Sequence, residues 1–146
     1  MHVVCLTDNT GRIIEPEWLS RAEIVHRQLR PQLPQEYVSR LSEVFANGGR
    51  MSVVAEGAQV ICVALWRIIE NTYEGRRLYV DDLVSDENRR SSGAGKILLD
   101  WLEGEANRQD CDVLALDSGV QRQRAHHFYF REGMHIPSFC FRKALK

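Results

Sequence analysis

The first fifty residues contain one short apolar run and two stretches with helical spacing. Met1–Leu6 is apolar and is followed by the turn signal DNTG, which predicts a strand and a turn. Glu15–Leu29 repeats apolar residues at three- and four-residue steps, which predicts a helix with the buried stripe Trp18, Leu19, Ala22, Ile24, Val25 and Leu29. After two prolines, a second helix is predicted over Gln35–Ala46, with the apolar face Val38, Leu41, Val44 and Phe45.

The rest of the chain predicts mostly strands, with two further helices between them. Three strand candidates follow one another at Met51–Ala55, Ala58–Ile69 and Arg77–Ser85. After them the pattern predicts, in order, a helix over Gly93–Gln109, a strand over Asp112–Asp117, a helix over Gln121–Glu132 and a strand over Met134–Leu145. The order β-α-α-β-β-β-α-β-α-β indicates an α/β fold layered around one sheet, with hairpins first and crossovers later.

The composition limits the class of protein. A chain of 146 residues predicts a single domain spanning residues 1–146. The net charge of −1 provides no field for nucleic acid or a membrane surface, and the basic residues form no stripe, so an anion site must be local. No apolar run approaches the roughly 20 residues that cross a membrane. The four cysteines lie at spacings that match no metal site, which predicts reduced thiols in a cytoplasmic protein without a metal.

The stretch RRSSGAGKILL, after the strand Arg77–Ser85, has the composition of an anion site. Glycines allow a close approach of the backbone, and a helix N-terminus has unpaired N–H groups and a positive dipole end. Arg89, Arg90 and Lys96 add positive charge. The composition indicates an anion, most often a phosphate at such a site, but does not identify it. The stretch lacks the third glycine of the dinucleotide-binding fingerprint and the Lys-Ser/Thr pair of the P-loop. The alternative is a plain loop with a serine N-cap.

This stretch also resembles a known family. The residues RSSGAG, Arg90 to Gly95, are similar to the Arg/Gln-x-x-Gly-x-Gly/Ala signature of the GNAT superfamily of N-acetyltransferases. LVSDENRRSSGAGKILL fits the family's strand–loop–helix motif, and AHHFYFREGM resembles its A-x-x-x-Y-x-x-x-G-F segment. The resemblance covers the chain in detail from about Met51 onward and implies a mixed, mostly antiparallel sheet flanked by helices.

Some positions depart from the family pattern, and two segments of the chain resemble two different groups within the family. Ser91 replaces the first glycine of the loop, Glu87 a proline, Cys62 a glycine, and Arg122 an asparagine that contacts coenzyme A in many members. LYVDDLV resembles the paired-acid strand of diamine acetyltransferases, whereas the C-terminal residues resemble those of aminoalkylphosphonate acetyltransferases. The acceptor is therefore left open.

The resemblance implies acetyl-coenzyme A as co-substrate. Its pyrophosphate is expected at the residues Arg90, Ser91, Ser92, Gly93, Ala94, Gly95 and Lys96, with Arg122 as a further phosphate contact. Its pantetheine arm is expected along the backbone of Leu83, Val84 and Ser85, where main-chain hydrogen bonds carry the affinity.

Acetyl transfer to an amine needs a base and an acid. An alkylammonium with a pKa of about 10.4 must lose a proton before it attacks. Asp81 is the first candidate for the base and Asp82 the second; they point to opposite faces of a regular strand unless a bulge re-aims them. The alternative for each is an ion pair with an arginine. Tyr129 matches the family tyrosine that protonates the departing thiolate; its alternative role is core packing.

These residues predict an N-acetyltransferase for a primary amine of a small, cationic molecule. The alternatives are acetylation of a protein N-terminus or lysine, and a non-catalytic module that binds or senses acyl-coenzyme A. A homodimer is expected. The acceptor pocket is expected from Glu15–Gly49, with Trp18, Trp66 and Tyr73 as candidates for its lining or for the core.

Overall fold

The computed structural model describes residues 1–146, which divide into two compact units, Met1–Ala115 and Leu116–Lys146. The elements are β1 (His2–Cys5), α1 (Pro16–Leu29), α2 (Tyr37–Ala46), β2 (Arg50–Glu56), β3 (Gln59–Asn71), β4 (Gly75–Ser85), the 3-10 turn η1 (Glu87–Arg89), α3 (Ala94–Arg108), β5 (Val113–Leu116) and α4 (Gln123–Arg131). The α/β class and the predicted order are confirmed as far as α4. No helix combines the length and the apolar character that a membrane span requires.

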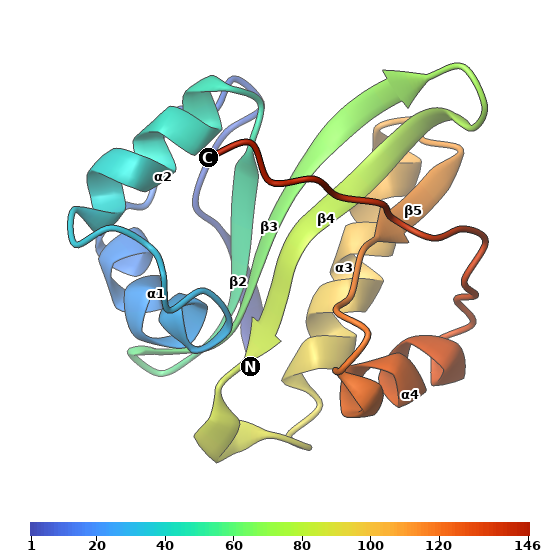
Figure 1. The fold of residues 1–146 in the computed structure, drawn as a ribbon. Helices are drawn as coiled ribbons and strands as arrows, with labels where there is room; N and C mark the ends of the chain where they lie inside the picture. Colours follow the sequence, from blue (N-terminus) through green and yellow to red (C-terminus); the bar gives the residue numbers. More distant parts are fainter. The chain divides into compact units, whose positions relative to one another are not determined.

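The five strands form one sheet in the order β1-β2-β3-β4-β5. The pairs β1–β2, β2–β3 and β3–β4 are antiparallel. Helices α1 and α2 cover one face of the sheet and α3 covers the other (Figure 1). Because both faces are covered, β2 and β3 read as nearly continuous apolar runs rather than as alternating patterns.

The core between α1, α2 and the sheet differs from the predicted stripes at two positions. Leu19, Ala22 and Val25 are buried as expected, but Ile24 is 76% exposed and Val38 is 45% exposed. In their place the structure buries the polar side chains of His26 and Tyr37. Each of these has a hydrogen-bond partner inside the core, which removes the cost of burial that would otherwise keep it at the surface.

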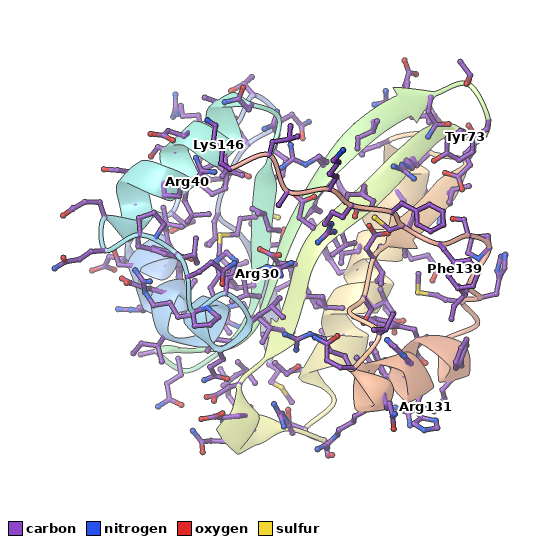
Figure 2. The ribbon with its side chains drawn as sticks, viewed as in Figure 1. Arg30, Arg40, Tyr73, Arg131, Phe139 and Lys146 are labelled. Carbon is purple, nitrogen blue, oxygen red and sulfur yellow. The ribbon has the colours of Figure 1, made fainter.

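The predicted final strand, Met134–Leu145, is wrong. These residues form neither helix nor strand, and the side chains of Phe139 and Phe141 are 84% and 94% exposed. Phe139 is labelled in Figure 2. A strand persists only when a neighbour pairs its backbone groups, and the unit Leu116–Lys146 contains α4 but no strand to pair with this segment. An apolar pattern alone therefore did not produce a strand here.

Candidate coenzyme and acceptor site

The last residues of β4 have an outer edge without a strand partner. Strand β3 pairs with β4 on one side along its whole length. On the other side β5 begins next to Arg76, whose carbonyl accepts a hydrogen bond from the Asp112 N–H at 2.6 Å. The four residues of β5 span about 13 Å, which is too short to reach Leu83, seven positions further along β4. Leu83–Ser85 therefore keep outer backbone groups for another partner.

The chain leaves this free edge through η1 and enters a glycine-containing loop. Ser91 and Gly93 both have left-handed backbone conformations, with φ of 64° and 89°. Gly93 is the N-cap of α3, and a Cβ added there would meet no atom within 4 Å. The next residues, Ala94 and Gly95, open the helix, so their N–H groups have no acceptor within it. The loop thus presents a helix N-terminus beside open space.

Three polar side chains show what this loop can bind. Ser92 Oγ is buried and has no hydrogen-bond partner, which is costly unless a ligand supplies one. Arg90 is exposed, whereas Arg89 forms an ion pair with Glu56, with 2.7 Å between Arg89 Nη2 and Glu56 Oε1. An unpartnered hydroxyl, an exposed guanidinium and a helix N-terminus are groups that can bind an anion such as a phosphate.

A β-bulge decides where the paired aspartates point. Leu65 on β3 lies opposite Asp82 and Trp66 lies opposite Val80, so Asp81 is an extra residue in β4. Asp82 contacts Arg30, the C-cap of α1, and Asp81 contacts Arg67. The bulge therefore turns both carboxylates to the side of α1 and α2, instead of to opposite faces.

Each aspartate is paired with an arginine, which was the alternative considered for both. The Arg67 guanidinium donates to Asp81 Oδ2 from Nε at 2.9 Å and from Nη2 at 2.5 Å. Arg67 also donates to the carbonyl of Asn47, at the end of α2. Arg30 donates to Asp82 Oδ1 at 2.6 to 2.7 Å, and its side chain lies on the α1 side of the sheet (Figure 2). The charges of the two pairs largely cancel.

Asp82 also ends a buried chain of hydrogen bonds that includes His26 and Tyr37. His26 Nε2 lies 2.7 Å from Asp82 Oδ2, and His26 Nδ1 lies 2.9 Å from Tyr37 Oη. A carboxylate only accepts, so His26 Nε2 donates to Asp82 Oδ2, and the Tyr37 hydroxyl is the hydrogen-bond partner of Nδ1. Burial raises the pKa of Tyr37, helped by the charges of Glu23 and Asp82, which keeps this hydroxyl protonated.

The same contacts set the charge of Asp82. Burial by itself raises the pKa of this carboxyl group, but the hydrogen bonds and charges of His26 and Arg30 outweigh it. The pKa of Asp82 therefore lies below its ordinary value, and the group is ionised at neutral pH. A carboxylate in this state holds its neighbours in place and is a weak proton acceptor.

Tyr129 and Arg122 belong to the second unit, in and beside α4. Gly133, with φ of 87°, follows the helix in a left-handed conformation. The Met134 N–H donates to the Tyr129 carbonyl and the Gly133 N–H to the Phe130 carbonyl, which is the Schellman arrangement. The four-residue spacing from Tyr129 to Gly133 thus places the tyrosine in the last turn of α4. Arg122 is its exposed N-cap.

Sequence comparison identifies the family. Residues 16–134 match the profile described as the acetyltransferase (GNAT) family. The chain belongs to this family. It is an acyltransferase, and GNAT enzymes use acetyl-coenzyme A as donor.

Two proteins are similar to this chain in sequence, and one solved structure is similar in fold. The uncharacterized N-acetyltransferase YhdJ of Bacillus subtilis is 33% identical over 132 residues, 87% of this chain and 91% of that protein. An aminoalkylphosphonate N-acetyltransferase of Salmonella typhimurium is 36% identical over 66 residues, 45% of this chain and 43% of that protein. The structure of AAC(6')-Iy with a coenzyme A bisubstrate analogue is similar in fold, with a TM-score of 0.78, 12% identity, and coverage of 99% and 97%.

Sequence reasoning missed His26, Arg30 and Tyr37 in this GNAT chain. The available signal was the position of His26, four residues after Ala22 on the predicted apolar stripe, with Arg30 four residues further on. A histidine on a buried face requires a polar partner, but the sequence does not say which of the many acidic residues provides it. Only the packing of α1 against β4 selects Asp82.

The structure places the three aromatic candidates for the acceptor pocket in different surroundings. Trp66 is buried and packs edge-to-face on Trp101 of α3, so it lies on the opposite face of the sheet from the aspartates. Tyr73 is 73% exposed at the turn between β3 and β4. Trp18 packs partly buried against the α1–α2 core. Trp66 is therefore a core residue and not part of an acceptor pocket.

The buried chain predicts a measurable contribution of Tyr37 to stability. Tyr37→Phe removes the hydrogen-bond partner of His26 Nδ1 and should lower the free energy of unfolding by about 1–2 kcal/mol in urea denaturation at pH 7. Tyr73→Phe is the matched control, because Tyr73 is exposed and should change stability by less than about 0.5 kcal/mol. Equal stability of the two variants would mean that the Tyr37–His26 bond contributes nothing.

Proposed function

We propose that this GNAT enzyme transfers an acetyl group from acetyl-coenzyme A to the primary amine of a small molecule by direct attack. One observation carries the proposal: the free outer edge of β4 leads directly into a loop with a buried, unpartnered serine hydroxyl. A free edge accepts the amide-bearing pantetheine arm as an added strand, and the loop accepts the pyrophosphate.

The coenzyme contacts follow from these two features. The backbone of Leu83, Val84 and Ser85 pairs with the pantetheine arm. The pyrophosphate lies on the loop and the first turn of α3, contacted by Arg90, Ser91, Ser92, Gly93, Ala94, Gly95 and Lys96. Arg122 supplies a further phosphate contact.

The transfer step requires proton movements at nitrogen and at sulfur. The base takes a proton from the ammonium group, the neutral nitrogen attacks the thioester carbonyl carbon, and the carbon–sulfur bond breaks as the nitrogen releases its second proton to water. Tyr129 gives its proton to the departing thiolate, since a phenolic O–H is a hydrogen-bond donor. Asp81 remains our first choice for the base, acting through water, because its side chain is 23% exposed and that of Asp82 only 8%. Asp82 is the second choice.

The charges of the aspartates and arginines in the site affect which amine it can accept. The amine is cationic before it loses its proton, which fits a carboxylate nearby. However, the arginines neutralise both aspartates, and the most exposed charged group of the cluster is Arg30, at 39%. This favours a second candidate, an amine that also carries an anionic group, as an aminoalkylphosphonate does. The relative named for that activity supports the same class.

A thiol-release assay with acetyl-coenzyme A tests the proposed function. The amine panel contains a diamine, an aminoalkylphosphonate, an aminoglycoside and a lysine-containing peptide. Turnover on a small amine supports the proposal, and the preferred compound separates the cationic class from the anionic one. Turnover on the peptide alone indicates a protein acetyltransferase. Binding of acetyl-coenzyme A without turnover on any amine indicates a binding or sensing module and contradicts catalysis.

We also propose that the enzyme works in the cytoplasm as a homodimer. The unpaired state of Cys5, Cys62, Cys111 and Cys140 supports a reducing compartment. Light scattering coupled to gel filtration measures the oligomeric state directly, and a mass of 16.8 kDa in solution would contradict the dimer.

A further inference from the structure

The last turns of α1 contact both halves of the candidate site. His26 and Arg30 hold Asp82, as described above. Between them in sequence, Gln28 reaches the start of the coenzyme loop instead. Its side-chain Nε2 donates to Asp86 Oδ1 at 3.2 Å, and its Oε1 accepts from the Glu87 N–H at 2.8 Å. One helix end therefore joins the acid pair to the loop that follows β4.

The residue that Gln28 contacts organises the first part of the loop. The Asp86 N–H donates to the Ile61 carbonyl of β3 at 2.8 Å, and Asp86 Oδ1 accepts from the Asn88 N–H at 3.1 Å. The Asp86 carbonyl also accepts from the Arg89 N–H. Asp86 is thus the N-cap of η1, and Gln28 fixes both its carboxylate and the next peptide group.

The second part of the loop depends on the first. It contains Ser91, a non-glycine residue with a left-handed φ of 64°, which costs conformational energy and persists only when its surroundings hold it. Upstream, η1 is held by Gln28 from α1 and by the Glu56–Arg89 ion pair from the β2–β3 hairpin. A loop held in its binding conformation before the ligand arrives loses less entropy on binding, so its affinity is higher.

We propose that Gln28 is a positioning residue for the coenzyme loop. The inference rests on the proposed function, because it assumes that the loop binds the coenzyme pyrophosphate. An amide is suited to this place because it donates to a carboxylate and accepts from an N–H at the same time. A carboxylate at position 28 still accepts from the Glu87 N–H, but it repels Asp86.

Gln28→Glu is the test variant, and Gln109→Glu is its matched control. Gln109 is also half-buried and also donates to a carboxylate, that of Glu105 at 3.0 Å, but it lies at the end of α3 away from the loop. We expect Gln28→Glu to raise the Kd and the KM for acetyl-coenzyme A about tenfold, with kcat within about twofold of wild type. Gln109→Glu should leave the Kd and KM within about twofold.

A second variant separates positioning from a general loss of stability. Asp86→Asn in the Gln28→Glu background lets the new carboxylate accept from the asparagine amide, and asparagine still caps η1. This double variant should recover most of the coenzyme affinity. A Kd for Gln28→Glu equal to that of Gln109→Glu, or no recovery in the double variant, overturns the inference. Failure of the wild type to bind acetyl-coenzyme A by calorimetry contradicts the proposed function instead, so the two failures are distinguishable.

Discussion

Gly93→Glu should abolish the stabilisation that acetyl-coenzyme A gives the wild-type protein. A ligand present at 100 times its Kd stabilises the folded state by about 2.7 kcal/mol, which raises the Tm of a domain of this size by about 5–10 °C. The substitution places a carboxylate where we expect the pyrophosphate, and it adds a side chain at a φ of 89°. The thermal midpoint of the variant should therefore be the same with and without coenzyme.

The control must carry the same backbone strain away from the loop. Gly57 also has a left-handed φ, of 59°, with no atom within 4 Å of an added Cβ, and it lies in the turn between β2 and β3. Gly57→Glu should lower the midpoint of the free protein by a similar amount and keep the response to acetyl-coenzyme A. If Gly93→Glu keeps the response as well, the coenzyme does not bind at the N-terminus of α3.

Tyr129→Phe should lower kcat by about 100-fold with little change in KM for acetyl-coenzyme A. The substitution removes only the hydroxyl, so the ring contact with Phe128 and the Schellman end of α4 are kept. Without the phenol, the thiolate must leave without a positioned proton donor. Steady-state thiol release at saturating amine measures the effect.

Two further measurements identify the cause of such a loss. Tyr73→Phe makes the same chemical change at an exposed site and should keep the wild-type kcat. The coenzyme-dependent thermal shift of Tyr129→Phe should match wild type, because the hydroxyl acts after binding. A kcat equal to wild type would show that water or another group protonates the thiolate, and Tyr129 would then be a packing residue.

Local patterns predicted those helices and strands whose own residues show a clear helical periodicity or an apolar run. The periodicity of Glu15–Leu29 and Gln35–Ala46 gave α1 and α2 to within two residues, and the apolar runs gave β2 to β5. The composition of RRSSGAG predicted an anion site, and the structure adds an unpartnered Ser92 hydroxyl in that loop. The same reasoning was wrong for Met134–Leu145, because strand formation depends on a partner that no local pattern contains.

The sequence by itself determined the class of fold, the order of elements as far as α4, the glycine-containing loop before α3 and the four-residue spacing from Tyr129 to Gly133. These features depend on residues close together along the chain, whose backbone preferences act locally. Only the tertiary structure decided that a bulge turns Asp81 and Asp82 to one side and that arginines neutralise their charges. It also decided that His26 of α1 binds Asp82 of β4 and that Gln28 of α1 binds the loop after β4. Those contacts join residues more than fifty positions apart for α1 and β4, and packing, rather than local propensity, selects them.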